Sequence, residues 1–435
     1  MPSSPQEGLA WKQTTFDLVP VWTRDPSTAA IEHVCRKQLN MAPGDPCIAS
    51  FHAEGLFNKV YLIRTAEQTF VMRVTLPVYP FFKTRAEVTT LRWVREHTKI
   101  PVPRVFGFDG SNDNEIGFEW ILMEFMEGIS ARKQWRTMTM EQKVALAEQL
   151  AEFHLQLSII GTDTTFKGIG SLQSSDSDMN ADDCISDEAV APGRLVSHEF
   201  FMGDHANYDI PRGPFGSTHE WLTTLLDIII RHQSLVLEVC EDEDDRDDAE
   251  EILPVAQKLL ALIPRIFPSE CSTVESTALQ HQDLSLNNIL VGEKGQVTAV
   301  LDWECVSALP LWMLSQVPKF LDGEDREEEP QRDKYRDKTP AEAAEAEARR
   351  NEPDYQDDEG KNELYWIHRM DFETTQLRKV FRYRLKELCP VCEDADPLKL
   401  NFYQAVSQCD GIWVGKASRW ADAVERGESI PFDDA

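Results

Sequence analysis

The chain has 435 residues, which is enough for two or three domain-sized units that bury a large core. Its formal net charge of −31 argues against a nucleic-acid partner, because phosphate backbones bind clusters of lysine and arginine. Two acidic runs, 241–251 and 324–359, carry much of this charge, and such runs are usually solvated, so the total does not identify a substrate.

The first 125 residues predict a leader followed by a small β-rich lobe. Residues 1–46 have weak periodicity, with one helix expected near 28–39 and packed outside this lobe. Runs rich in Val, Ile, Phe and Tyr then predict strands, interrupted by one helix at 83–97. The strands are expected at 47–53, 59–64, 69–75, 104–109 and 118–125.

Three features of this lobe are weak signals when each is taken alone. Residues 54–58 join the first two strands and contain a single glycine, so by themselves they predict an ordinary turn. Arg73 shares one face of the third strand with Val71, and a surface arginine is the simpler interpretation. Glu87 lies in the first half of the helix, where an unpaired, solvated glutamate is the alternative.

Beyond residue 126 the pattern becomes helical. His154 lies on the apolar stripe of the first long helix and is expected to support the core. Residues 161–215 are polar and irregular, which predicts a lid or substrate loop, or partial disorder. Capping boxes or apolar periodicity predict helices at 139–157, 217–239, 249–266, 364–388 and 401–424.

The most informative stretch is 279–304, LQHQDLSLNNILVGEKGQVTAVLDWE. His281 and Asp283 are expected on a turn, Asn288 leads into a short buried strand, and a second strand delivers Asp302. Such a hairpin brings two carboxylates and a carboxamide together. These groups suit Mg²⁺ carrying a phosphate, with one carboxylate left to accept a proton. An ordinary polar hairpin in an unrelated fold is the alternative.

The cysteines and the apolar segments indicate the cellular compartment in which the protein is expected. Nine scattered cysteines predict reduced thiols, and the single pair Cys389 and Cys392 favours a helix end followed by a loop over a metal or redox site. The first residues lack the features of a signal peptide, and no segment reaches the ~20 apolar residues that a membrane span needs. We therefore expect a cytoplasmic protein without a membrane partner.

The spacing His-x-Asp-x-x-x-x-Asn, followed by an apolar strand and Asp302-Trp303-Glu304, resembles the catalytic segment of the aminoglycoside phosphotransferase family, which is similar to protein kinases in fold. Protein kinases have His-Arg-Asp and Asp-Phe-Gly at these places, whereas this chain has Gln282 and Trp303-Glu304. Both departures favour the small-molecule phosphotransferases. The resemblance covers about 47–320.

The resemblance implies an α+β, bilobal, protein-kinase-like fold. Residues 47–126 would form the N-terminal lobe, an antiparallel five-stranded sheet with one helix. Residues 127–435 would form a larger, mostly α-helical C-terminal lobe that contains the hairpin 279–304, C-terminal helices, and an acidic insertion at about 322–361 that is a poor core former with one short helix.

The resemblance also implies a reaction, in which the γ-phosphoryl group of ATP moves to a hydroxyl of a small molecule with the help of Mg²⁺. Asp283 would accept or orient the hydroxyl proton, while Asn288 and Asp302 would hold the metal. His281 is expected to support the loop by hydrogen bonding. Neither the acceptor nor the oligomeric state follows from the sequence.

The nucleotide site is implied in the same way. Gly55, Phe57 and Asn58 would cover the phosphates. Arg73, oriented by Glu87, would hold the phosphates that are not transferred, with arginine in the place of the kinase lysine. Main-chain groups near Glu124 and Met126 would hydrogen-bond to adenine.

Two other functions stay open at this point. The first is a catalytically weak or inactive nucleotide-binding pseudokinase that acts as an interaction module. Retention of Asp283, Asn288 and Asp302 together argues against it, whereas Arg73 and the glycine-poor turn leave room for it. The second is a protein kinase, which the motif Asp302-Trp303-Glu304 and the lack of a following Ala-Pro-Glu segment disfavour.

Overall fold

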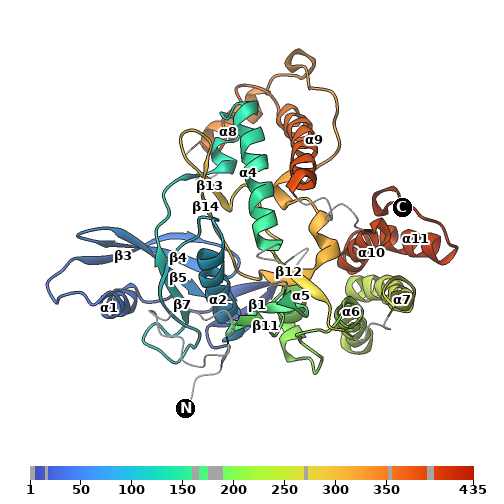
Figure 1. Ribbon diagram of the computed structural model, residues 1–435, viewed down its shortest axis with the longest axis horizontal. Coiled ribbons are helices and arrows are strands. Elements are labelled where there is room, and N and C mark those ends of the chain that lie inside the picture. Colours follow the sequence, from blue (N-terminus) through green and yellow to red (C-terminus); the bar gives the residue numbers. More distant parts are fainter. Residues whose placement is uncertain are drawn as a thin grey trace.

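The structure is a computed structural model that describes residues 5–14, 18–158, 166–174, 190–268, 273–350, 355–388 and 396–435. Helices and sheets alternate along the chain, and Figure 1 shows them gathered into a sheet-containing N-terminal part and two groups of helices. The mixed α and β composition agrees with the expected fold class.

One antiparallel sheet of five strands occupies the N-terminal part, in the order β3-β4-β5-β7-β6. Alternation along the central strand sends Met72 and Val74 to one face and Val71 and Arg73 to the other. The expected strands are therefore present, with small shifts at their ends. Their bounds are β3 (Cys47–Glu54), β4 (Asn58–Thr65), β5 (Thr69–Thr75), β6 (Val105–Asp109) and β7 (Glu119–Glu124).

Helices cover the two faces of this sheet. Helix α1 (Thr28–Gln38), capped by Ser27, buries Ile31 and Val34 in a cluster with Met72. Helix α2 (Phe82–His97) packs on the opposite face, which is the face that carries Arg73. The helix expected in the leader is thus present, but the leader also contains an unpredicted hairpin of β1 (Leu9–Gln13) and β2 (Leu18–Trp22).

The remaining helices form two groups, which lie at the top and at the right of Figure 1. One group packs α4 (Met140–Ser158) against α9 (Glu363–Leu388) around a cluster that includes Leu150 and Phe381. The other group has its own core around Trp420. Its members are α6 (Thr218–Val239), α7 (Glu243–Ile266), α10 (Pro397–Gln408) and α11 (Val414–Glu425).

Two small sheets join these parts. The order β11-β10-β15-β12-β9 defines one, and β14-β13-β8 defines the other. The prediction of an irregular segment at 161–215 is wrong for its described residues, which contain strands, the short helix α5 (His198–Phe201) and the 3-10 helix η2 (Gly203–Asn207). The strands are β8 (Ile129–Ser130), β9 (Phe166–Lys167), β10 (Gly170–Ser174), β11 (Val190–Pro192), β12 (Ser276–Gln280), β13 (Ile289–Val291), β14 (Val297–Val300) and β15 (Ser307–Pro310).

The two acidic runs have different structural roles. The first was expected to precede a helix starting at 249, but it forms the first turns of α7, where Asp242 caps the backbone N–H groups. Carboxylates are favourable there because they face the positive end of the helix dipole. The second run contains helix α8 (Pro340–Ala348) and is held on α9 by ion pairs such as Asp325 with Arg378.

Cysteines and apolar helices complete the fold. Cys35, Cys47, Cys240, Cys305 and Cys409 carry free thiols, while Cys389 and Cys392 lie outside the described residues. Within the ranges that the structure describes, no helix has both the length and the apolar character required to cross a bilayer.

Candidate active site

The hairpin of β13 and β14 presents Asn288 and Asp302 at its open end. Ile289 pairs with Val300, and Gly295 makes the connecting turn with a φ of 80°, a conformation that favours glycine. The Leu301 amide donates to the Asn288 carbonyl over 2.8 Å. This bond extends the hairpin by one step and places Asn288 beside the segment that leads into Asp302.

Asp283 has both carboxylate oxygens engaged. The side-chain amide of Asn288 donates to Oδ2 over 2.9 Å, and Lys319 Nζ lies 2.7 Å from Oδ1. Lys319 belongs to the 3-10 helix η4 (Lys319–Leu321), which is tied to the loop by a 2.9 Å bond from the Phe320 amide to the Leu284 carbonyl. Each carboxylate oxygen has two lone pairs, so Asp283 can still accept a proton.

His281 and Trp303 hold this loop from below. His281 lies 3.0 Å from the Leu301 carbonyl through Nε2 and packs edge-on against Trp303, whose indole donates to the Val300 carbonyl over 2.9 Å. Burial lowers the pKa of His281, which favours the neutral ring. His281 therefore supports the loop, and the Trp of Asp302-Trp303-Glu304 is a core residue. His154 is likewise buried, 2.9 Å from the Leu314 carbonyl.

Asp302 faces the N-terminal sheet. Its backbone has a φ of 61°, unusual for a residue other than glycine, and its Oδ1 lies 3.5 Å from Arg73 Nη1. Arg73 also forms an ion pair with Glu87, and both are buried. Burial and the carboxylate of Glu304 raise the pKa of Asp302, although Arg73 opposes them. The expected order of strand, basic residue, helix and Glu87 thus produces a real contact.

The sequence alone did not predict a second buried ion pair in this region. Lys83, in the first turn of α2, is 1% exposed and pairs with Glu304. Asn58 also donates to Glu304 over 2.8 Å and accepts from the hydroxyl of Thr75 over 2.9 Å. Burial alone would raise the pKa of Glu304, but Lys83 and Arg73 outweigh it and hold this pKa below its ordinary value.

The turn between β3 and β4 places its residues differently. The Gly55 amide donates to the Asn58 carbonyl over 2.9 Å, which closes a tight turn, and Gly55 faces open space. Phe57 is buried and packs edge-on against Phe201 of α5. Asn58 is therefore brought to the site, while Phe57 anchors the turn in the hydrophobic cluster beside it.

The segment that follows β7 connects the sheet to the helices. The amide of Glu124 donates to the Arg104 carbonyl over 2.8 Å, and its carboxylate accepts from the Arg104 amide over 3.0 Å. These main-chain and side-chain groups thus face β6. Met126 lies two residues beyond the strand and is half-buried. The main-chain contacts to adenine that were expected near Glu124 and Met126 stay a prediction.

The side-chain oxygens at this site suit a metal ion that is also bound by other ligands, such as phosphate oxygens. The side-chain nitrogen Nδ2 of Asn288 donates to Asp283, so the side-chain oxygen Oδ1 of Asn288 can face a metal. Asp302 supplies a carboxylate. Within the described ranges, no group of three or more His, Cys, Asp or Glu side chains is arranged so that it could hold a metal ion. The side-chain oxygens of Asn288 and Asp302 are ligands of the type that Mg²⁺ takes, and Mg²⁺ is usually held by one or two side chains together with substrate phosphates.

Comparison with known proteins decides the family. The model described as "Phosphotransferase enzyme family" matches residues 49–313, more than half of the chain. The chain belongs to this family. The resemblance expected from the hairpin is therefore confirmed. Because the match begins in β3 and ends beyond β15, it includes both the sheet and the catalytic hairpin.

This phosphotransferase family member matches only part of the length of its curated relatives. A subtelomeric hrmA-associated cluster protein of Aspergillus fumigatus is 28% identical over 306 residues, which are 62% of this chain and 59% of that protein. The altered inheritance of mitochondria protein 9 of Candida glabrata is 27% identical over 166 residues, 32% of this chain and 25% of the relative. The chain thus spans about three-fifths of the first relative and a quarter of the second.

Two solved structures are similar to this chain at low sequence identity. A putative aminoglycoside phosphotransferase from Ralstonia eutropha is 16% identical, with 94% of each chain covered and a TM-score of 0.43. The apo form of a thermostable mutant of APH(4)-Ia is 15% identical, with 91% of this chain and 98% of that chain covered and the same TM-score. Membership of the family depends on the match to 49–313 and not on these scores.

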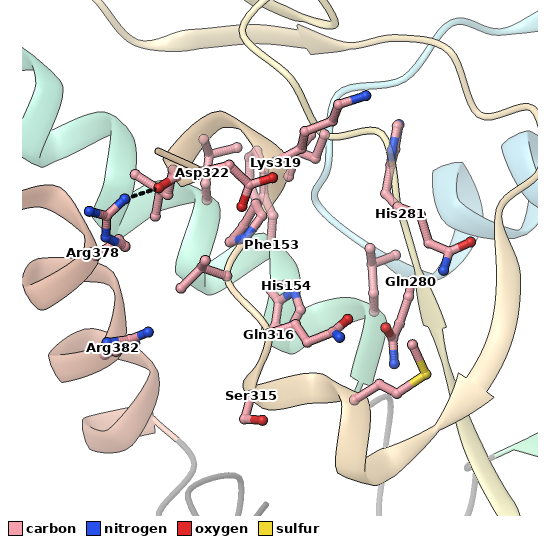
Figure 2. Close-up of a pocket in the computed structure, with 18 of the residues that line it drawn as sticks. Phe153, His154, Gln280, His281, Ser315, Gln316, Lys319, Asp322, Arg378 and Arg382 are labelled. Atoms are coloured by element: carbon pink, nitrogen blue, oxygen red, sulfur yellow. Dashed lines mark hydrogen bonds between the residues drawn. The ribbon is translucent and has the colours of Figure 1, made fainter. Parts of the chain in front are cut away.

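A cavity of about 1010 Å³ lies beside the catalytic loop of this phosphotransferase family member. Figure 2 shows His281 and Gln280 on one side, Phe153 and His154 of α4 behind, and Arg382 of α9 on the opposite side. Lys319 also lines it, which connects the cavity to Asp283 through the 2.7 Å contact. Gln404 of α10 contributes from the other helix group.

Proposed function

We propose that this chain is an ATP-dependent phosphotransferase that moves the γ-phosphoryl group to a hydroxyl of a small molecule. The observation that carries the proposal is the convergence of Asp283, Asn288 and Asp302 opposite Arg73 and its partner Glu87. Positioning and charge neutralisation account for most catalysis of phosphoryl transfer, so this set of groups is sufficient for the reaction.

Asp283 is the residue we assign to the acceptor. It orients the hydroxyl and takes its proton as the bond to phosphorus forms. Asn288 and Lys319 each contact one carboxylate oxygen and so favour one orientation of Asp283. Asn288 and Asp302 would hold Mg²⁺, which supplies neutralisation of the phosphate charge when it is bound.

The nucleotide end of the site, as we define it, comprises Asn58, Arg73, Lys83, Glu87, Asp302 and Glu304. We assign Arg73 to the phosphates that stay on the nucleotide, because a guanidinium offers a permanent charge and a planar pair of donors. Gly55 and Asn58 would cover the phosphates, and adenine would lie in the segment near Met126, between a nucleotide lobe at 47–126 and a second lobe at 127–435.

The acceptor end, as we define it, is the cavity beside Lys319. Its volume is within the range of small-molecule sites, and its apolar back and polar rim suit a hydroxylated compound. Elements that are distant in sequence line it, from the catalytic loop, α4, α9 and α10. An acceptor held there would contact Lys319, which in turn touches Asp283.

Thermal-shift measurements with ATP and Mg²⁺, followed by an acceptor screen that records ATP consumption, test this proposal. A phosphotransferase is stabilised by the nucleotide and consumes it only when a suitable small hydroxyl compound is present. A lack of any nucleotide-dependent shift would favour an interaction module. Incorporation of phosphate only into protein would favour a protein kinase.

A further inference from the structure

Lys83 occupies a position that is unusual for a lysine. Lysines are rarely fully buried unless they are paired, and Lys83 is 1% exposed. Its ammonium pairs with Glu304 and lies 5.4 Å from the centre of the Phe57 ring. It therefore lies between the turn that follows β3 and the segment that carries Asp302, at the nucleotide end of the site.

The groups around Lys83 come from three separate parts of the chain. Asn58 belongs to the start of β4, Thr75 to the end of β5, and Glu304 follows the catalytic hairpin. Hydrogen bonds of 2.9 Å from Thr75 to Asn58 and of 2.8 Å from Asn58 to Glu304 join all three. Lys83 therefore contacts both the turn between β3 and β4, through Phe57, and the motif Asp302-Trp303-Glu304, through Glu304.

Arg73 and Lys83 differ in what they can offer a phosphate. Arg73 is held by Glu87 on one side and lies 3.5 Å from Asp302 on the other, so its position is constrained by two carboxylates. Lys83 has an ammonium with three donors, and the contacts described for it are one oxygen of Glu304 and the face of Phe57. Lys83 therefore has donor capacity beyond its bond to Glu304, although its side chain is only 1% exposed.

We propose that Lys83 is a second phosphate-binding cation, which binds the terminal phosphate oxygens of the nucleotide while it remains paired with Glu304. This inference rests on the proposed function, because it requires a nucleotide in the cleft. Arg73 would bind the phosphates nearer the sugar. In this division Arg73 offers a planar pair of donors from β5, and Lys83 offers a compact ammonium charge from α2.

Calorimetric titrations of ATP and AMP in EDTA test the assignment without any turnover. Removing Lys83 alone would leave Glu304 buried and unpaired, which could unfold the chain, so the main variant is the double substitution Lys83→Met with Glu304→Gln. It removes both charges and keeps the carbonyl that accepts from Asn58. Lys83→Arg, which keeps the charge, is the matched control.

We expect the double variant to bind ATP roughly 10- to 100-fold more weakly than wild type, as for the loss of a hydrogen bond between charged groups. AMP, which lacks the terminal phosphates, should bind both proteins equally. Lys83→Arg should retain most of the ATP affinity. Unchanged ATP affinity in the double variant, or an equal loss for AMP, would overturn the assignment. A wild-type chain that binds neither nucleotide would instead overturn the proposed function itself.

Discussion

The nucleotide end and the acceptor end of the cleft hold their charges in different ways. At the nucleotide end the side chains of Arg73 and Glu87 are 8% and 1% exposed, and Lys83 is equally buried in its pair. At the acceptor end the side chains of Lys319 and Asp283 are 57% and 50% exposed. Buried pairs are fixed in place before any ligand arrives, whereas exposed pairs separate at little cost.

This difference fits the two substrates that we propose. A nucleotide has the same phosphates in every reaction, so a prearranged set of charges can recognise it. An acceptor site with exposed charges, an arginine such as Arg382 at its rim and a volume of about 1010 Å³ can be altered without disturbing the fold. Substitutions at the two ends should therefore differ in their effects on turnover, on nucleotide binding and on stability.

The largest expected effect is on turnover. Asp283→Ala removes the group that joins the two ends, and general-base catalysis contributes typically ~10²–10⁴-fold to a rate. We expect kcat to fall by that factor while ATP affinity stays within about twofold, because the nucleotide end does not include Asp283. Parallel measurements of turnover and of ATP binding by calorimetry check both parts. Retained turnover would contradict the role of Asp283.

A substitution should lower the free energy of unfolding at the nucleotide end and leave it nearly unchanged at the acceptor end. Glu87→Ala leaves the buried Arg73 with Asp302, 3.5 Å away, as its remaining carboxylate partner, and is expected to lower the free energy of unfolding by up to about 3–5 kcal/mol. The matched control is Arg382→Ala at the acceptor end, which should change it by no more than about 0.5 kcal/mol. Urea unfolding curves of the three proteins measure the difference. Equal effects of the two substitutions would remove the contrast.

Lys319→Met tests the exposed pair. Its loss should reduce kcat/KM for the acceptor by roughly 10- to 100-fold, since Lys319 orients Asp283 by a hydrogen bond between charged groups. The melting temperature should change little, because both partners are exposed. Steady-state kinetics and a thermal melt on the same sample check this. A variant that melts early with normal kcat/KM would show a structural role instead.

Glu119 provides a pH-dependent test of how α2 is held. Its carboxylate accepts from the Phe81 amide over 2.8 Å at the start of the helix, and burial raises its pKa to about 7. Because the folded chain then binds the proton more tightly than the unfolded chain, the proton stabilises the fold at low pH. This contribution is lost as the pH rises towards and through 7.

Glu119→Gln should remove that dependence. The difference in free energy of unfolding between variant and wild type should shift in favour of the variant between about pH 5 and pH 8, because other groups titrate alike in both proteins. Urea unfolding at several pH values measures it. A constant difference across this range would mean that Glu119 does not titrate there.

The catalytic hairpin was predictable because its geometry is local. Asp283 and Asn288 are five residues apart, and the strand pattern between Asn288 and Asp302 predicts the turn that brings them together. The pairing of Arg73 with Glu87 was predictable only from the family resemblance, because each residue taken alone was a weak signal.

Long-range contacts were not predictable from spacing. Lys83 and Glu304 are 221 residues apart, and the lysine gave no signal beyond its place at the start of a helix. Lys319 lies in a segment without regular pattern, so nothing linked it to Asp283. The side-chain partners of Glu124 and Phe57, the Arg104 amide and the Phe201 ring, were likewise not indicated by the sequence.

The most direct test of the central claim is a ³¹P NMR time course of ATP with Mg²⁺, the protein and a set of small hydroxyl compounds. The account predicts loss of the γ-phosphate resonance of ATP and growth of a phosphomonoester resonance that belongs to a small molecule. This growth should be absent with Asp283→Ala, although that variant still binds ATP. If the phosphoryl group appears only on protein or in inorganic phosphate for every acceptor, the central claim is contradicted.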